Sequence, residues 1–149
     1  MLTIEPITLV GKYIKLRPPS IEDIDGLSIA AKDGEIWNNS FTQFPNASEI
    51  SNYIQEMLDL CSKGIILPFI TIDKDSNTTV GTTRYLNIDY ENHRLEIGDT
   101  WIAKSWRKTY VNTEAKFLML QHAFEKLGCI AVEIRTDALN TFHVKQFKI

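Results

Sequence analysis

The sequence predicts one domain, spanning residues 1–149, of the mixed α/β or α+β class. In three segments apolar residues recur every three or four positions, and five shorter runs bounded by turn residues have the character of strands. Their order is strand, helix, helix, three strands, helix, strand. The chain is long enough to bury its own core, and its 44% hydrophobic and 23% charged residues are typical of a soluble globular protein.

The first strand and two helices are expected in the N-terminal half. Residues 13–18 alternate between polar and apolar side chains, and a pair of prolines stops this strand. Ser20 is the predicted N-cap of the first helix, with Asp23 three residues on as the acidic partner of the first turn. The second helix is expected to begin after an N-cap at Ser48 and to end at Gly64.

The second half is expected to be mostly sheet. Three strands joined by short polar links predict an antiparallel meander, at residues 67–73, 79–88 and 95–102. A helix over 112–127, ended by Gly128, then leads to a last strand at 130–137. This helix is long enough for a crossover, so the strands on either side of it are expected to be parallel neighbours.

Composition excludes several classes of function. The formal net charge is −3 and the isoelectric point about 5.6, which argues against a nucleic-acid-binding module, and the basic patch of Lys104, Arg107 and Lys108 is small. The N-terminus has no signal-peptide pattern, and no apolar run approaches the ~18 residues of a membrane span. We therefore expect a cytoplasmic protein with no membrane partner.

The cysteines and histidines indicate neither a reactive thiol nor a metal site. Cys61 and Cys129 stand in apolar patterns typical of buried, reduced thiols. His93, His122 and His143 are scattered, without the spacing of metal ligands. No metal cofactor is expected.

The start of the third helix has two interpretations. Cations precede it, and the first N–H groups of a helix have no partner within the helix, which together favour a site for a diphosphate. An ordinary capped helix with a solvated basic entry, capped by Thr109 or Asn112, would have the same pattern.

Four stretches of the sequence carry a resemblance to a known family: RYLNI, LEIGDTWIAKSW, VNTEAKFLMLQHAFEKLGC and VEIRTDALN. They are similar to the GNAT acetyltransferase superfamily, and to its branch of ribosomal-protein-type N-terminal acetyltransferases. The resemblance extends from Leu9 to Asn140, and the words NTEAK and TDALN are specific to that branch. It implies a GNAT-like mixed sheet and an acetyl-CoA-dependent N-acetyltransferase, with a primary amine such as a protein N-terminus as acceptor.

The resemblance also implies where acetyl-CoA binds. The strand before the third helix would splay from the strand after it, and the co-substrate would lie in the gap. Backbone groups of Trp101, Ile102 and Ala103 would contact pantetheine, and Asn140 would contact the co-substrate or brace the site. The pyrophosphate cradle would be formed by Arg107, Lys108, Thr109, Tyr110, Val111, Asn112 and Thr113.

One departure from the superfamily concerns glycine. The superfamily's loop has glycines that let the backbone approach phosphate closely, and Lys108 and Tyr110 occupy those positions here. This predicts a cradle that is tighter or differently shaped and binds the pyrophosphate more weakly. The positive charge of Lys108 would offset part of that loss in affinity.

Two carboxylates are candidates for the catalytic base, because the attacking amine must lose a proton. Glu96 lies within an apolar strand, where burial would raise its pKa toward a useful range, although an outward or ion-paired role is the alternative. Strict alternation would put Glu96 on one face of the strand, and Asp99, an alternative base or amine anchor, on the other with Trp101. Arg84 is expected to form a structural ion pair with Glu96 or a neighbour, with a substrate contact as the less favoured alternative.

The C-terminus departs from the resembled family, which continues with a helix and two strands after the position of Asn140. Here the chain has TFHVKQFKI instead, so the usual last helix and strands are expected to be missing. The last predicted strand would then be a bare edge, which favours a homodimer or a strand-swapped oligomer. The competing interpretation of function is a non-catalytic remnant that binds CoA or acts as an assembly module.

Overall fold

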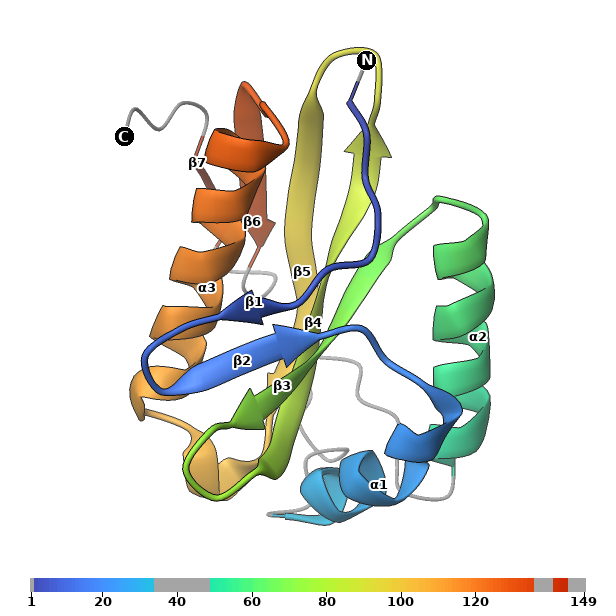
Figure 1. The fold of residues 1–149 in the computed structure, drawn as a ribbon, viewed down its shortest axis with the longest axis vertical. Helices are drawn as coiled ribbons and strands as arrows, with labels where there is room; N and C mark the ends of the chain where they lie inside the picture. The colour runs from blue at the N-terminus through green and yellow to red at the C-terminus, as the bar shows by residue number, and fades with distance from the viewer. Residues whose placement is uncertain (1, 34–48, 136–140, 145–149) are drawn as a thin grey trace.

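A computed structural model describes residues 2–33, 49–135 and 141–144 of the chain (Figure 1). In this part, seven strands form one sheet in the order β1-β2-β3-β4-β5-β6-β7. They are β1 (Leu9–Val10), β2 (Ile14–Arg17), β3 (Leu67–Asp73), β4 (Thr78–Asp89), β5 (Arg94–Ile102), β6 (Ala131–Arg135) and β7 (Thr141–Val144). The helices are α1 (Ile24–Lys32), α2 (Ile50–Ser62) and α3 (Tyr110–Gln121), with short 3-10 turns η1 (Ile21–Asp23) and η4 (Lys104–Trp106) and a π-helical turn η5 (His122–Lys126).

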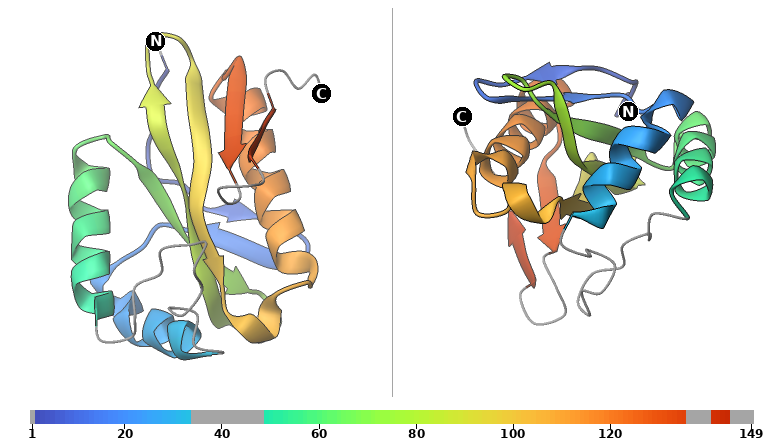
Figure 2. Two further views of the ribbon diagram at one scale, coloured as in Figure 1. Left: turned by 180° about the vertical axis from the view of Figure 1, so that it is seen from behind. Right: turned by 90° about the horizontal axis from the view of Figure 1, so that it is seen from below.

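The sheet lies between two helical layers, α3 on one face and α1 with α2 on the other (Figure 2). Each face has its own apolar cluster. Ile97 of β5 packs with Leu118 and Met119 of α3 in one cluster, and Ile70 of β3 packs with Leu27 and Ile54 of the other helices in the second. No helix in the described ranges is both long enough and apolar enough to span a bilayer.

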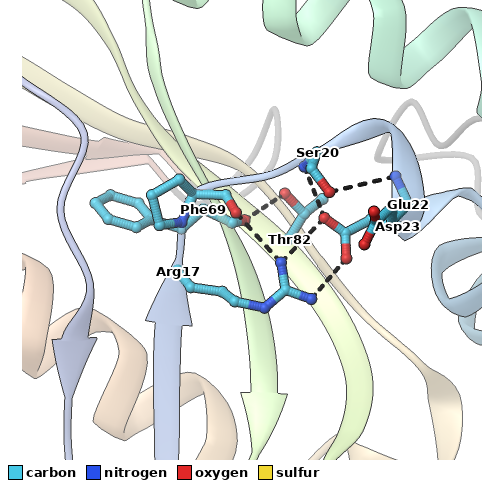
Figure 3. A network of polar contacts seen from close by, with 7 residues as sticks. Arg17, Ser20, Glu22, Asp23, Phe69 and Thr82 are labelled. Carbon is cyan, nitrogen blue, oxygen red and sulfur yellow. Dashed lines mark hydrogen bonds and ion pairs between the residues drawn. The ribbon is translucent and has the colours of Figure 1, made fainter.

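The first helical segment starts at the predicted cap. The Ser20 hydroxyl accepts a hydrogen bond from the Glu22 N–H, and the Asp23 carboxylate accepts one from the Ser20 N–H at 2.7 Å. Arg17, at the end of β2, holds the same carboxylate with two guanidinium nitrogens at 2.6 and 3.0 Å (Figure 3). The capping box predicted from the sequence is therefore confirmed, and the arginine fixes it to the sheet.

The predicted strand pairing is confirmed. β3, β4 and β5 pair antiparallel in succession, and β5 pairs parallel with β6. Gly64 and Gly128 follow α2 and the α3–η5 helix with φ of +74° and +75°, the left-handed conformation expected of helix-ending glycines. The third helix begins at Tyr110, two residues before the predicted start, and the predicted cap Ser48 lies outside the described residues.

The prediction of a bare edge at the last long strand is wrong. β7 pairs antiparallel with β6, from Val132 opposite Val144 to Arg135 opposite Thr141. The segment TFHV supplies this strand because its residues are compatible with extended structure and the edge of β6 offers unpaired backbone groups. The pairing of β7 with β6 removes the reason for which a dimer was expected, and the dimer stays a prediction.

Candidate functional site

β5 continues toward the start of α3 beyond its parallel pairing with β6, and we call the place where this pairing ends the fork. Their parallel pairing runs from Arg94 opposite Ala131 to Ile97 opposite Ile134, whereas β5 continues to Ile102. The last residues of β5 keep their pairing with β4. Figure 2 shows β6 beside only the first part of β5. The pairing ends one residue before the end of β6, and residues 136–140 lie outside the described residues, so the splayed strands expected from the resemblance stay a prediction.

The segment after the fork turns into α3 through η4. Asp33, at the end of α1, anchors this turn, because its carboxylate accepts a hydrogen bond from the Ser105 N–H at 3.0 Å. Thr109 is the N-cap of α3, with its hydroxyl accepting from the Val111 N–H at 3.3 Å and donating to the Trp106 carbonyl at 2.5 Å. The loop is thus held in place at both ends.

Several amides at the start of α3 have no acceptor within the described part of the chain. Of the predicted cradle, Val111 donates to its own cap and Arg107 to the Lys104 carbonyl. Thr113 lies far enough into the helix for its N–H to have a helical partner. The N–H groups of Lys108, Thr109, Tyr110 and Asn112 remain, at the positive end of the helix dipole. This arrangement can bind an anion.

Lys108 has a glycine-like backbone. Its φ is +61°, in the left-handed region that side chains disfavour and glycine tolerates. Lys108 stands at a position where the resembled superfamily has glycine. In this chain a lysine therefore adopts the left-handed backbone conformation that glycine tolerates. Tyr110, at the second such position, is the first residue of α3 in an ordinary helix.

Two side chains fasten the start of α3 to the sheet. The Tyr110 hydroxyl donates to Asp73 at the end of β3, and this bond, followed by burial, raises the pKa of Tyr110 to about 12. Burial acts to raise the pKa of Asp73, but hydrogen bonds from Ser76 and Tyr110 outweigh it and the pKa is lowered. Glu114 accepts hydrogen bonds from the backbone N–H groups of residues 12–14 at 2.7 to 3.1 Å. The sequence analysis gave Glu114 no role of its own, although it belongs to the motif NTEAK.

Some of the backbone groups predicted to contact pantetheine have partners within the chain. The Ala103 N–H donates to the Val80 carbonyl at 2.8 Å, and the Ile102 carbonyl accepts from the Arg107 Nε at 3.3 Å. The Trp101 carbonyl lies so close to Gly81 that a Cβ there would be 2.1 Å away. Glycine at this position therefore sets how closely the end of β5 approaches β4.

The predicted alternation along β5 is wrong beyond Gly98. Thr82 pairs with Trp101 but Arg84 with Gly98, so two residues of β5 stand opposite one residue of β4. Asp99 is in this bulge with φ +47°. The extra residue reverses the faces, and Trp101 therefore packs with α1 and α2, whereas Ile97 packs with α3.

The two candidate bases differ in environment. Glu96 is buried, 7% exposed, and its Oε1 accepts a hydrogen bond from Asn87 Nδ2 at 2.7 Å. Its Oε2 lies next to Gly98, where a Cβ would be 3.3 Å away. The Asp99 side chain is 58% exposed and lies 3.6 Å from Arg84. The expectation that Arg84 forms an ion pair is confirmed, with Asp99 as the partner.

A tyrosine that the sequence analysis did not single out joins this group. The Tyr53 hydroxyl of α2 accepts hydrogen bonds from Arg84 Nη2 and Trp101 Nε1, both at 3.4 Å. Burial raises the pKa of Tyr53, against the lowering effect of the Arg84 charge, so its phenol stays protonated. The helical spacing of Tyr53 is that of an ordinary core residue, and only the tertiary structure brings it to β4 and β5.

The cysteines are free thiols, as expected, with Cys129 buried and Cys61 partly buried. Burial raises the pKa of Cys129 to about 11 and raises that of Cys61, which leaves both thiols unreactive at neutral pH. Within the described ranges, no three His, Cys, Asp or Glu residues gather as metal ligands would. The predicted cofactor contact Asn140 lies outside the described residues.

Comparison with known proteins gives consistent matches. The model of the acetyltransferase (GNAT) domain family matches residues 14–145. The uncharacterized N-acetyltransferase p20 of Bacillus licheniformis is 30% identical over 139 residues, which are 93% of this chain and 78% of that protein.

Solved structures share the fold. A GCN5-related N-acetyltransferase from Brucella melitensis is 29% identical with a TM-score of 0.72, over 87% of this chain but 60% of the Brucella protein, less than two thirds of its length. The ribosomal L7/L12 alpha-N-protein acetyltransferase RimL, solved without ligand and also in complex with coenzyme A, is similar in fold alone. The ligand-free form has a TM-score of 0.75 at 16% identity, over 93% of this chain and 80% of RimL.

Proposed function

Because the chain belongs to the acetyltransferase (GNAT) domain family, we propose that it transfers the acetyl group of acetyl-CoA to a primary amine. The observation that carries the proposal is the fork between β5 and β6, which leads directly into a helix start with unpaired amides. A fork exposes backbone groups along one strand edge, and the helix start attracts a diphosphate. Both features lie on one continuous segment of the chain.

In this proposal the diphosphate of CoA is bound at the start of α3. The N–H groups of Lys108, Tyr110 and Asn112 donate to its oxygens, and the side chains of Arg107 and Lys108 add positive charge. The pantetheine arm lies along β5 beyond Ile97, where β6 no longer pairs. RimL, which shares this fold, has been solved in complex with coenzyme A.

Glu96 is the proposed base. Its Oε2 has no hydrogen-bond partner within the described residues and lies beside Gly98, at the opening of the fork. It takes the proton of the attacking amine, the new C–N bond forms, and the C–S bond of the thioester breaks. The thiolate leaves as CoA and is protonated from solvent. A backbone N–H of β5 beyond the fork stabilises the oxyanion of the tetrahedral intermediate.

The acceptor is proposed to be a primary amine such as a protein N-terminus. RimL bears the name of an alpha-N-protein acetyltransferase, and its fold similarity of 0.75 in TM-score supports this class of acceptor. Asp99, largely exposed in its bulge, is the proposed anchor for the incoming ammonium group. Its ion pair with Arg84 and its exposure make it a poorer base than Glu96.

Calorimetric titration with acetyl-CoA tests the cradle, and a thiol-release assay with amines and peptides tests catalysis. Replacing Arg107 and Lys108 by Ala should weaken acetyl-CoA binding by about 1–3 kcal/mol, because charge-assisted hydrogen bonds to phosphate are lost. A Lys63→Ala/Lys126→Ala double variant removes the same charge from remote surface positions and should leave binding unchanged. Equal affinities for the two double variants would refute the cradle, and binding without turnover of any amine would indicate a CoA-binding module that is not an enzyme.

A further inference from the structure

A polar cluster lies between α2 and the sheet, on the face opposite α3. It consists of Tyr53, Arg84, Asp99 and Trp101. The Tyr53 hydroxyl is 3.4 Å from both Arg84 Nη2 and Trp101 Nε1, and Arg84 Nη1 is 3.6 Å from the Asp99 carboxylate. The Arg84 guanidinium also lies 5.8 Å from the centre of the Tyr53 ring. The cluster therefore joins α2 to the bulge of β5.

Two hydrogen-bond donors in this cluster have no acceptor among the residues that the structure describes. The Arg84 side chain is 9% exposed, and its Nε is buried without a hydrogen-bond partner in the described part of the protein. A buried donor left unpaired costs about 1–3 kcal/mol, so such a group calls for an explanation. Tyr53 accepts with its oxygen from two donors, which leaves its own O–H to donate.

Arg84 stands close to the proposed base in the sheet, and the Tyr53 hydroxyl adjoins the Arg84 guanidinium. Arg84 is the register partner of Gly98, and Glu96 is two residues further along the same face of β5. Such diagonal neighbours lie roughly 7–8 Å apart, and above Gly98 the Glu96 Oε2 and a methyl group of Leu86 lie 3.3 and 3.1 Å from the position that a Cβ would take. A group of a few atoms therefore spans the distance from the carboxylate of Glu96 to the guanidinium of Arg84.

We propose that Arg84 and Tyr53 bind an oxygen of the acceptor substrate, next to the amine that Glu96 deprotonates. The inference rests on the proposed acetyl transfer and adds a specificity determinant to it. The preferred acceptor carries a carbonyl oxygen on the carbon beside its amine-bearing carbon, as an α-amino amide does. A plain alkylamine lacks that oxygen and leaves both donors unpaired, which is a strong basis for discrimination.

Formal charge favours an uncharged carbonyl over a carboxylate. Arg84 contributes one positive charge, and Asp99, Glu96 and Glu133, the register partner of Glu96 in β6, contribute three negative charges, so the four side chains sum to −2. An ammonium group with a neutral carbonyl reduces this negative charge, whereas a zwitterionic amino acid does not. We therefore expect the order glycinamide, then glycine, then ethylamine in kcat/KM.

The test compares these three amines with saturating acetyl-CoA in the wild-type chain and in Tyr53→Phe and Arg84→Lys. For glycinamide, Tyr53→Phe should lower kcat/KM about 3- to 10-fold and Arg84→Lys about 10- to 100-fold. For ethylamine the loss in each variant should be smaller than for glycinamide, because neither donor has an oxygen to bind. Tyr90→Phe is the matched control, since the Tyr90 hydroxyl donates to the Gly64 carbonyl away from the site.

The outcomes separate the two proposals. Equal losses for glycinamide and ethylamine overturn the oxygen subsite while leaving acetyl transfer intact. If the wild-type chain acetylates no amine, the proposed function fails. Calorimetric titration of the CoA-loaded protein with glycinamide and ethylamine then tests the subsite alone, and equal affinities overturn it. Because Arg84 is buried, thermal unfolding of each variant is measured to show whether a loss in kcat/KM reflects misfolding. Tyr53→Phe tests the subsite with less risk to the fold, since it removes only the hydroxyl and retains the ring.

Discussion

Lys108 holds a backbone conformation that costs stability. A non-glycine residue in the left-handed region loses roughly 1–2 kcal/mol, and Lys108 has φ +61°. We expect Lys108→Gly to raise the free energy of unfolding by up to about 1 kcal/mol, because part of the relief is offset by greater freedom of the unfolded chain. Urea unfolding followed by circular dichroism measures the change.

The neighbouring residue provides the control for this prediction. Arg107 has φ −70° and ψ 150°, which any residue adopts, so Arg107→Gly should lower stability instead. If both glycine variants are destabilised alike, Lys108 is not strained. Lys108→Gly removes a positive charge but lets the backbone approach phosphate more closely. A lower affinity for acetyl-CoA in this variant would show that the charge matters more, and a higher affinity that the closer approach does.

His122 gives stability a dependence on acidity. It is 8% exposed and stacks with the Tyr85 ring at 6.5 Å, and burial, followed by the charge of Lys126, lowers its pKa. A folded-state pKa below the ordinary 6.5 means that the unfolded chain binds the proton more readily. The stability from the neutral ring is therefore complete above about pH 6.5 and is lost as the pH falls through the folded-state pKa.

His122→Gln should therefore flatten the decline of melting temperature below about pH 6.5, because the titrating ring is gone. Melting curves between pH 7.5 and pH 5, recorded by circular dichroism, measure this slope. His93→Asn is the control, since it removes a histidine from a turn where φ is +54° and asparagine is tolerated. A slope for His122→Gln that equals the wild-type slope would show that another group causes the decline.

Among the elements, α3 depends on the hairpin of β1 and β2 for its position. The Glu114 carboxylate accepts three backbone hydrogen bonds from Lys12, Tyr13 and Ile14, two of them at 2.7 Å. Glu114→Gln replaces one acceptor oxygen by a donor that faces an N–H. We expect a loss of about 1–3 kcal/mol in the free energy of unfolding. Glu125→Gln, an exposed change in the following turn, should stay within about 0.5 kcal/mol.

Binding should respond to Glu114→Gln as well. Glu114 lies one turn into the helix whose first amides are proposed to hold the diphosphate, so its release loosens that end. We expect a lower affinity for acetyl-CoA, measured by calorimetry at a temperature where the variant is folded. Unchanged affinity with lowered stability would limit Glu114 to a structural role.

Element order and strand pairing were predictable because they depend on local signals. The periodicity of apolar residues, the helix caps and the helix-ending glycines predicted the meander and the parallel pair of strands. They also predicted the ends of two helices at Gly64 and Gly128. β7 was missed because a strand of only four residues has little local signal of its own and gains its stability from pairing with β6. The bulge at Asp99 was missed for a related reason, since an extra residue in one strand is visible only against its partner.

The candidate site was predictable only in part. The helix start and Glu96 stand out because charge or hydroxyl groups interrupt an apolar pattern. Tyr53 does not, since an aromatic residue at helical spacing is normally core, and its hydroxyl meets Arg84 across a separation of 31 residues. Glu114 likewise contacts a turn about one hundred residues away. Long-range polar contacts of this kind carry no local signature in the chain.

For the whole molecule, a ligand at the fork would tie several layers together. The segment between β5 and α3 is bound to α1 through Asp33, and the first turns of α3 are bound to β3 through Tyr110 and to the β1–β2 hairpin through Glu114. A ligand that binds only the folded chain stabilises it by about 2.7 kcal/mol at a concentration of 100 times its Kd. For a chain of this size we expect the melting temperature to rise by about 5–10 °C with saturating acetyl-CoA.

Differential scanning fluorimetry with increasing acetyl-CoA measures this shift, and pantetheine at the same concentrations is the control. Pantetheine fills the fork but lacks the diphosphate, so it should raise the melting temperature far less than acetyl-CoA. Equal shifts for the two compounds would place the binding energy in the fork and leave the start of α3 without its proposed role. No shift at millimolar acetyl-CoA would contradict binding, because a ligand that binds only the folded protein raises its stability by RT ln(1 + [L]/Kd).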